Sequence, residues 1–267
     1  SKIPYLLCPF LKKEINLKND LNAFIFLVNY LRQTNPRLAS IHSSKAGILG
    51  RFASLITFTK CIYTAHGWSF NSKSNLLSNI FYVLIEYLTQ FIPRKIITVS
   101  NYDKKTAINR LFLKNKLVTI HNSVPYINLK KSEKVLKNNS NNNLIRILTV
   151  ARLDYQKDHF TILKSLSRIN TTRKWHIDFI GDGPLLDRYI LFAKELNILS
   201  KVTFHGFVSN TYHFYEKSDI FLLMSHWEGF PRSTLEALRS SLPILISDVG
   251  GSKEAVIESK NGYIIPE

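Results

Sequence analysis

The 267-residue chain is predicted to be an α/β protein with two doubly wound, Rossmann-like domains. Short apolar runs alternate with stretches whose apolar residues recur at helical spacing, which predicts alternating strands and helices. This alternation occurs on both sides of a polar, low-complexity segment, residues 128–143 (NLKKSEKVLKNNSNNN). We therefore predict an N-terminal domain at residues 1–127, a linker at 128–143 and a C-terminal domain at 144–267.

The second half shows the alternation most clearly. Residues 144–150 (LIRILTV) have the composition of a buried strand, and residues 158–169 carry apolar side chains at helical spacing. Residues 175–180 form a strand that the turn sequence GDGP ends. The remaining predicted elements are strands at 202–204, 219–224, 242–247 and 262–265, and helices at 184–196 and 231–241.

The first half has the same character with a weaker pattern. Its predicted elements are helices at 20–32 and 76–91 and strands at 60–65, 95–100 and 116–120. Successive strands joined by helices form parallel sheets, and open parallel sheets bind ligands beyond the carboxyl ends of their strands. A ligand cleft is therefore expected between the two domains.

Charge is concentrated in the first half of the chain. Residues 1–140 contain 21 Lys and Arg against 5 Asp and Glu, a net charge of +16, whereas residues 141–267 have a net charge of +1. A nucleic acid, an anionic membrane surface, a phosphorylated substrate or simple solubility would each account for this excess. Because we recognise no nucleic-acid-binding module, no nucleic acid partner is expected.

Composition also bears on the compartment. A mean hydropathy of −0.05 argues against a polytopic membrane protein, and polar residues interrupt the longest apolar stretch, residues 75–92. No basic segment followed by an apolar one opens the chain. Two cysteines, Cys8 and Cys61, do not make a disulfide framework or a metal site. The cytosol is therefore the expected compartment.

Two motifs of the second half follow predicted strands and therefore lie at the expected ligand edge. Residues 228–236 (EGFPRSTLE) combine a turn with a helix start, where free backbone N–H groups attract phosphate. In this motif Glu236 is placed to accept from ribose hydroxyls, and Glu228 lies in the loop before the helix. Residues 151–157 (ARLDYQK) supply two cations, Arg152 and Lys157, that suit a phosphate. Surface glutamates around a helix cap and solvated basic residues are the structural alternatives.

Two weaker motifs lie in the first half. His66, in the sequence TAHGW, follows a predicted strand and can donate to a sugar oxygen or assist a proton transfer. Residues 42–51 (HSSKAGILGR) place small residues and Lys45 before an apolar helix, which suits an anion. A structural histidine and an ordinary small-residue loop are the alternatives.

The ordered set HSSKAGILGR, TAHGW, ARLDYQK, GDGPL, EGFPRSTLEAL and ILISDVGGSKEAV resembles the family 4 glycosyltransferases over residues 5–267. That family consists of retaining enzymes with the two-domain GT-B fold and nucleotide-sugar donors. The HSSKAG and HGW motifs resemble members that build exopolysaccharide, capsule or O-antigen on a lipid carrier. The resemblance implies a UDP-sugar donor, a lipid-linked or saccharide acceptor and no metal or other cofactor.

The resemblance also implies a role for each motif residue. Arg152 and Lys157 would bind the donor diphosphate, and Glu236 the nucleotide ribose. The carboxylate of Glu228 and the backbone of the adjoining turn would contact the transferred sugar. That turn consists of Gly229, Phe230 and Pro231. His66 would lie at the reacting centre, and Lys45 and Gly47 on the acceptor side.

Four features depart from the family pattern. Asn122-Ser123 stands where the family has Asn-Gly, and Ser40 precedes His42 where relatives often have a second histidine. The family's first strand with its glycine-rich loop is expected before residue 1, and its closing helices after residue 267. The chain is thus expected to be a piece of a longer enzyme.

Glycosyl transfer passes through an oxocarbenium-like state, so stabilising the departing diphosphate is the main electrostatic task. The chain has no Asp-x-Asp pair, which argues against metal-dependent sugar transferases of another fold. The resemblance implies a front-face mechanism in which the leaving phosphate takes the acceptor proton. A sugar-nucleotide epimerase of the same fold and a non-catalytic nucleotide-sugar or membrane-binding protein are the alternatives. A dinucleotide oxidoreductase is rejected, because GDGPLL lacks the third glycine of its fingerprint.

The basic half suggests that the protein is peripheral on the inner face of the cytoplasmic membrane. The apolar face of the helix at 76–91 would insert into such a surface. The alternative is that this face packs in the protein core, which is more common for apolar helix faces.

Overall fold

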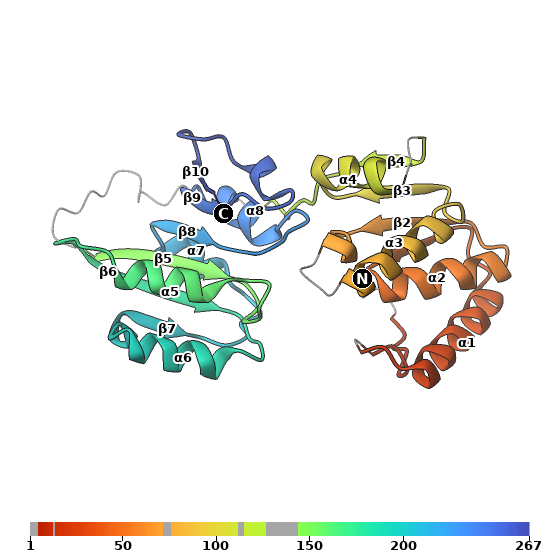
Figure 1. Cartoon of the computed structure of the whole chain (residues 1–267), viewed down its shortest axis with the longest axis horizontal. Coiled ribbons are helices and arrows are strands. Elements are labelled where there is room, and N and C mark those ends of the chain that lie inside the picture. The colour runs from red at the N-terminus through yellow and green to blue at the C-terminus, as the bar shows by residue number, and fades with distance from the viewer. Residues whose placement is uncertain (1–4, 13, 72–75, 112–114, 127–143, 267) are drawn as a thin grey trace. The chain divides into compact units, whose positions relative to one another are not determined.

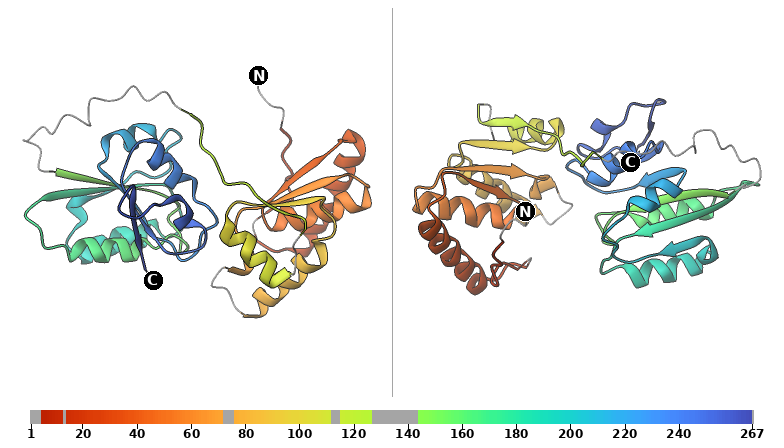
Figure 2. Two further views of the ribbon diagram at one scale, coloured as in Figure 1. Left: turned by 90° about the horizontal axis from the view of Figure 1, so that it is seen from above. Right: turned by 180° about the vertical axis from the view of Figure 1, so that it is seen from behind.

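A computed structural model describes residues 5–12, 14–71, 76–111, 115–126 and 144–266. The chain divides into two compact units, Ser1–His121 and Asn122–Glu267, each built on a parallel sheet with helices packed on it (Figures 1 and 2). The prediction of two Rossmann-like domains is confirmed. The expected linker, residues 128–143, lies mostly in a range that the structure does not describe, and the domain limits and the cleft stay predictions.

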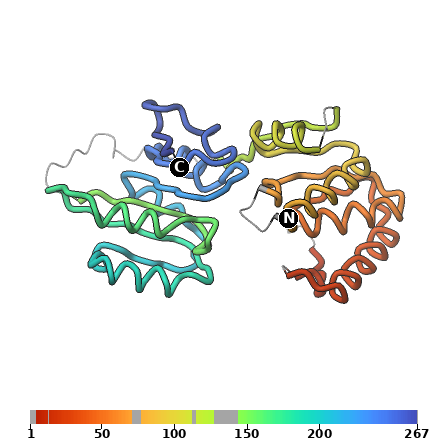
Figure 3. Tube along the Cα trace, in the orientation of Figure 1, coloured from red at the N-terminus to blue at the C-terminus, as the bar shows by residue number. Residues whose placement is uncertain are grey.

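The second unit has the strand order of a dinucleotide-binding fold. Its sheet runs β10-β9-β8-β5-β6-β7, so the chain starts in the middle, winds to one edge and returns to wind to the other. Figure 3 shows this path along the Cα trace. The topological switch point lies between β5 and β8. Its strands are β5 (Leu144–Val150), β6 (Lys174–Ile180), β7 (Val202–Phe204), β8 (Ile220–Leu223), β9 (Ile244–Ser247) and β10 (Gly262–Ile265).

Helices cover both faces of this sheet. Ile147 of β5 belongs to the core that contains α5 and α6, whereas its neighbour Leu148 belongs to the core that contains α7 and α8. Successive strand residues face opposite sides, so the two cores lie on opposite faces. The helical elements are α5 (His159–Ser167), α6 (Leu186–Glu195), η3 (Leu199–Lys201), α7 (Tyr212–Lys217), α8 (Arg232–Arg239) and η4 (Ser252–Ala255).

The first unit is a sheet of order β1-β2-β3-β4 with its helices packed against it. Its strands are β1 (Ala39–His42), β2 (Cys61–Ala65), β3 (Lys95–Thr98) and β4 (Leu117–Thr119). Its helical elements are α1 (Leu17–Thr34), α2 (Lys45–Ile56), η1 (Ser69–Asn71), α3 (Leu76–Thr89) and α4 (Asn101–Leu111). The sequence pattern missed β1, α4 and α7, because each is short or has few apolar residues.

A buried ion pair joins two helices of the first unit. The guanidinium of Arg51, which is fully buried in α2, donates two hydrogen bonds to the carboxylate of Glu86 in α3, at 2.7 and 3.0 Å. The same guanidinium lies 4.2 Å from the ring centre of Tyr63 in β2. Burial, followed by the charge of Glu86, raises the pKa of Tyr63. The polar residue Glu86 thus stands within the apolar stretch 75–92 because it is the buried partner of Arg51.

The outward side of α3 does not pack in the core. Tyr82 and Val83 contact the core of the first unit, but a stripe along the same helix and its end is exposed. The exposed stripe consists of Leu77, Ile80, Phe81, Leu84, Tyr87, Leu88 and Phe91. The core-packing expectation is therefore wrong for this stripe. Among the described helices, none combines the length and apolar character needed to cross a membrane.

The second unit contains a buried histidine, His159, whose pKa is lowered. His159 is 1% exposed, lies 5.1 Å from the ring of Phe179 and 5.0 Å from that of Tyr189, and its Nδ1–H donates to the carbonyl of Lys157. Burial, the largest cause, lowers the pKa of His159 to about 4.

Stability should consequently fall as the pH drops from 7 to 5. The unfolded chain binds a proton at His159 near the ordinary pKa of 6.5, whereas the folded chain stays neutral until about pH 4. This contribution is complete above pH 6.5 and decreases toward pH 4, with a loss of about 2 kcal/mol at pH 5. Urea unfolding of the chain and of His159→Asn, which keeps the donor, measures it. An equal pH dependence in both proteins would contradict the prediction.

Candidate functional site

The loops after β5 and β8 meet at the switch point of the second unit. The ammonium of Lys157, from the loop after β5, pairs with Oε1 of Glu228, from the loop after β8. The hydroxyl of Ser225 donates to the same Oε1 at 2.6 Å. The side chains of Lys157 and Glu228 are only 12% and 6% exposed, so their charges attract each other strongly. The structure therefore brings together two residues that the sequence placed in separate motifs.

A side-chain hydrogen bond and a backbone hydrogen bond join these two loops. The side-chain amide of Gln156 donates to the carbonyl of Trp227 at 2.8 Å, and the N–H of His226 donates to the carbonyl of Gln156 at 2.9 Å. Gly250, which has φ of +56°, lies so close that a Cβ there would be 1.9 Å from the carbonyl oxygen of Glu228. The glycine of the DVGG motif thus lets the Glu228 loop approach β9.

The turn GDGPL supports the Arg152 loop. At Gly181, which has φ of +137°, a Cβ would lie 2.0 Å from the carbonyl oxygen of Ala151. The side chain of Arg152 is 60% exposed, and its guanidinium contacts Oδ2 of Asp154 and Oε1 of Gln156, each at 3.1 Å. Arg152 is therefore held by its own loop while most of its surface is accessible.

Helix α8 begins shortly after Glu228 of the Lys157–Glu228 pair. Pro231 is its N-cap, with extended backbone and no side-chain hydrogen bond to the first turn. The buried residues Gly229 and Phe230 lead into it, and Nδ2–H of Asn122 donates to the carbonyl of Phe230 at 2.7 Å. Uncapped N–H groups and the helix dipole favour an anion at such a helix end, and phosphate binding here stays a prediction. Asn122, from the Asn-Ser sequence that stands where the family has Asn-Gly, thus supports the turn predicted to bind phosphate.

Glu236 lies in the second turn of α8, and the sequence analysis missed its partner. Its Oε2 accepts from the hydroxyl of Tyr215 in α7 at 3.0 Å. Tyr215 is buried, and burial with the adjacent charge of Glu236 raises its pKa, so it remains a donor. Tyr215 thus holds one carboxylate oxygen of Glu236, and ribose binding by this carboxylate stays a prediction. No local motif signals this role, because α7 was not predicted.

In the first unit, His66 is paired with a second histidine. Nε2 of His66 lies 3.0 Å from Nδ1 of His42, and Nε2 of His42 lies 3.0 Å from Oγ of Ser40. Loss of solvent around the ring, followed by the charge of His42, lowers the pKa of His66 below its ordinary value. His66 therefore binds a proton less readily than a free histidine does.

Lys45 and Gly47 have evident structural roles in α2. The ammonium of Lys45 contacts Oδ1 of Asp20 at 2.5 Å and donates to the carbonyls of Lys12 and Glu14, which ties it to the segment around the start of α1. A Cβ on Gly47 would lie 2.7 Å from the ring of Tyr63. Acceptor binding by these two residues stays a prediction.

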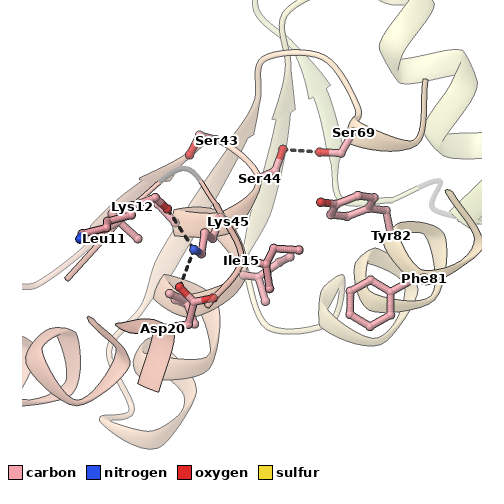
Figure 4. Close-up of a pocket in the computed structure, with 13 residues that line it drawn as sticks. Leu11, Lys12, Ile15, Asp20, Ser43, Ser44, Lys45, Ser69, Phe81 and Tyr82 are labelled. Atoms are coloured by element: carbon pink, nitrogen blue, oxygen red, sulfur yellow. Dashed lines mark hydrogen bonds and ion pairs between the residues drawn. The ribbon is translucent and has the colours of Figure 1, made fainter. Parts of the chain in front are cut away.

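A cavity of about 590 Å³ lies beside Lys45 (Figure 4). Ser43, Ser44 and Ser69 give it a polar side, and Figure 4 shows Phe81 and Tyr82 of α3 along another side. The apolar remainder comprises Leu11, Ile15, Ala46, Ile48 and Leu49. The cavity therefore suits an amphiphilic molecule.

The predicted residues thus form one group in each unit. Arg152, Lys157 and Glu228 lie around the switch point, whereas His66 belongs to the first unit, and its joint action with Glu228 stays a prediction. Within the described ranges, no three His, Cys, Asp or Glu side chains cluster as metal ligands.

Comparison with known proteins identifies the family of both units. Residues 130–267 match the family of glycosyl transferases group 1, and residues 4–126 match Glycosyltransferase Family 4. The chain is 30% identical over 236 residues to the O-antigen biosynthesis glycosyltransferase WbnH of Escherichia coli, covering 88% of this chain and 64% of that protein. The chain therefore spans less than two thirds of that relative.

A second relative and a solved structure agree with this match. The chain is 29% identical over 272 residues to the UDP-Gal:alpha-D-GlcNAc-diphosphoundecaprenol alpha-1,3-galactosyltransferase of Escherichia coli, covering 96% of this chain and 69% of that protein. Anabaena HepE, solved with UDP and glucose, superimposes with a TM-score of 0.78 at 17% identity, covering 95% of this chain and 70% of HepE. That likeness confirms the predicted GT-B fold. The chain belongs to the family of glycosyl transferases group 1.

Proposed function

We propose that this chain binds a UDP-sugar and, within the whole enzyme, transfers its sugar with retention to a lipid-linked or saccharide acceptor during surface polysaccharide synthesis. The observation that carries the proposal is the Lys157–Glu228 pair, which joins the two switch-point loops beside the uncapped start of α8. The named relatives and the UDP complex of HepE support the choice of donor.

In this proposal the second unit binds the donor without a metal or other cofactor. The diphosphate lies at the N-terminus of α8, where Arg152 and Lys157 add positive charge, and Glu236 accepts from the ribose hydroxyls. These groups stabilise the negative charge that develops on the leaving diphosphate. Glu228, with the turn formed by Gly229, Phe230 and Pro231, contacts the transferred sugar.

The transfer itself follows a front-face course. The bond between the anomeric carbon and the diphosphate oxygen breaks, and the acceptor oxygen forms its bond on the same face. The departing phosphate oxygen takes the acceptor proton, so no covalent enzyme intermediate is needed. His66 donates a hydrogen bond to a sugar or acceptor oxygen at the reacting centre.

A thermal-shift panel tests the donor. UDP, GDP and ADP are added to the chain and to Lys157→Met, with the exposed Lys164→Met as the matched control. A nucleotide at 100 times its Kd stabilises by about 2.7 kcal/mol, which raises Tm by a few degrees. We expect a shift with UDP that Lys157→Met loses and Lys164→Met keeps. No shift with any nucleotide, or an equal shift in both variants, contradicts the donor site.

The ribose assignment predicts two variants with the same defect. Glu236→Ala removes the carboxylate, and Tyr215→Phe removes the hydroxyl that holds it. Each should raise the Kd for UDP about tenfold, because a charge-assisted hydrogen bond contributes about 1.5–3 kcal/mol. Calorimetric titration measures Kd, with the exposed Glu195→Ala of α6 as control. Unchanged UDP affinity in Glu236→Ala contradicts the assignment.

The acceptor is proposed to be lipid-linked, with an apolar part in the cavity of the first unit. The apolar walls of the cavity and the acceptor in the name of the galactosyltransferase relative support this choice. Phe81 lines the cavity, whereas Leu55 is exposed on α2 outside it. In the complete enzyme, Phe81→Ala should raise KM for a lipid-linked acceptor but not for its water-soluble analogue, and Leu55→Ala should change neither. Equal effects of Phe81→Ala on both acceptors contradict this placement.

Association with the inner membrane surface is proposed for the same unit. The exposed apolar stripe of α3 and the net charge of +16 over residues 1–140 support it, since basic residues contribute about 1 kcal/mol each near an anionic surface. The chain should float with vesicles that contain anionic lipid and not with zwitterionic ones. The double variant Leu84→Ser/Leu88→Ser should float less. Equal recovery with both vesicle types contradicts the proposal.

The transferase and epimerase alternatives differ in their need for an acceptor. An epimerase converts the sugar nucleotide with no acceptor present, whereas the proposed enzyme leaves its donor sugar unchanged in that mixture. Chromatography of the nucleotide sugar after incubation with the complete enzyme distinguishes them.

A further inference from the structure

Three side chains of the first unit form a continuous hydrogen-bonded chain that ends at His66. Parallel pairing of β1 with β2 places Ser40 opposite Ile62 and His42 opposite Thr64. Ser40 and His42 share one face of the sheet because they are two residues apart. His66 follows Thr64 by two residues, and its ring lies beside that of His42, with centroids 5.3 Å apart and planes inclined by only 24°.

Hydrogen-bond chemistry restricts how protons are arranged in this chain. Nδ1 of His42 and Nε2 of His66 lie 3.0 Å apart, so only one of the two nitrogens carries the hydrogen between them. Nε2 of His42 lies 3.0 Å from Oγ of Ser40. If Ser40 donates, neutral His42 must carry its hydrogen on Nδ1 and donate to His66. Neutral His66 must then carry its own hydrogen on Nδ1.

We propose that Ser40 and His42 are positioning residues that fix His66 as the Nδ1–H tautomer, so that it presents a hydrogen-bond donor to the reacting sugar. This inference rests on the proposed glycosyl transfer. In that reaction the leaving phosphate accepts the proton, so the reacting centre needs a donor from His66 and not a base. Within the described residues, Nδ1 of His66 has no hydrogen-bond partner and is available to a ligand.

The proposal requires Ser40 to donate its hydroxyl hydrogen to Nε2 of His42, because this direction sets the tautomer of His66. A hydroxyl that accepted from His42 would reverse every bond and leave Nδ1 of His66 as an unprotonated acceptor. The two directions therefore predict opposite tautomers of one ring. His66 needs the second ring because imidazole alone interconverts between its tautomers in water.

The tautomer is measured directly by nuclear magnetic resonance. Long-range ¹⁵N–¹H correlation of the histidine-labelled chain at pH 7.5 should show His66 protonated at Nδ1. Ser40→Ala and His42→Leu should shift His66 toward the Nε2–H tautomer. Ser40→Thr keeps a hydroxyl and His42→Asn keeps a donor near the position of Nδ1, so both should retain Nδ1–H. A wild-type His66 protonated at Nε2, or a tautomer unaffected by either disrupting variant, overturns the proposal.

Kinetics of the complete enzyme separates positioning from folding. His42→Leu should lower kcat between about 2- and 10-fold, the effect of one hydrogen bond, while Kd for UDP stays unchanged. His42→Asn should restore kcat to within about twofold. Loss of kcat in both variants alike overturns the positioning role. The tautomer measurement needs no turnover, so it stands even if the glycosyl transfer fails and distinguishes the two failures.

Discussion

Replacing Glu228 by Gln is expected to lower kcat of the complete enzyme by about 100-fold or more while strengthening UDP binding. The carboxylate faces the transferred sugar in the proposed complex, and a fixed negative group there stabilises the positive charge that develops at the anomeric carbon. The amide keeps the shape but loses that charge. Without nucleotide it also leaves Lys157 as a buried charge with no counter-charge, which costs stability.

The UDP diphosphate then supplies the missing counter-charge. The chain with Glu228→Gln should therefore unfold at a lower temperature than the wild type when empty, and UDP should raise its Tm by a larger amount. Thermal unfolding with and without UDP measures both effects, and single-turnover kinetics measures kcat. Exposed Glu195→Gln is the matched control and should change neither. A smaller UDP shift in Glu228→Gln than in the wild type would contradict this account of the pair.

The fold and the positions of the motifs were predictable because both depend on local pattern. β5 and α5 each follow an apolar period, and the turns that carry Arg152 and Glu228 directly follow strands of the sheet. Parallel strands end at one edge, so motifs that follow strands approach one another without any knowledge of the packing. That rule explains why Lys157 and Glu228 were both proposed for the donor site.

The contacts of those residues were not predictable, because they depend on segments far apart in the sequence. Lys157 meets Glu228 across 71 positions, and Tyr215 meets Glu236 from a helix that has no clear period. Gly250 was quoted within a motif, but its close approach to the carbonyl of Glu228 follows only from the folded backbone. His42 was noted for its neighbour Ser40, and only β-strand pairing brings it to His66.

Removal of Glu86 should cost the first unit about 3–5 kcal/mol of stability. Glu86→Ala leaves the guanidinium of Arg51, which is 0% exposed, without its counter-charge and without two hydrogen bonds. Arg51 also donates from Nε to the carbonyl of Gly47 at 3.0 Å, so its displacement would disturb the start of α2 beside the proposed acceptor cavity. Acceptor binding should be lost together with the stability of this unit.

Calorimetry of the chain with UDP distinguishes a defect in one unit from general unfolding. Glu86 belongs to the first unit and the proposed UDP site to the second. In Glu86→Ala the transition that UDP does not shift should move to lower temperature, while the UDP-dependent transition is retained. The double variant Arg51→Met/Glu86→Leu should regain most of the lost stability, since apolar residues of similar volume often replace a buried ion pair without loss. A loss of stability below about 1 kcal/mol in Glu86→Ala would mean that water or another group compensates the charge of Arg51. The ion pair would then not explain why this apolar helix contains a glutamate.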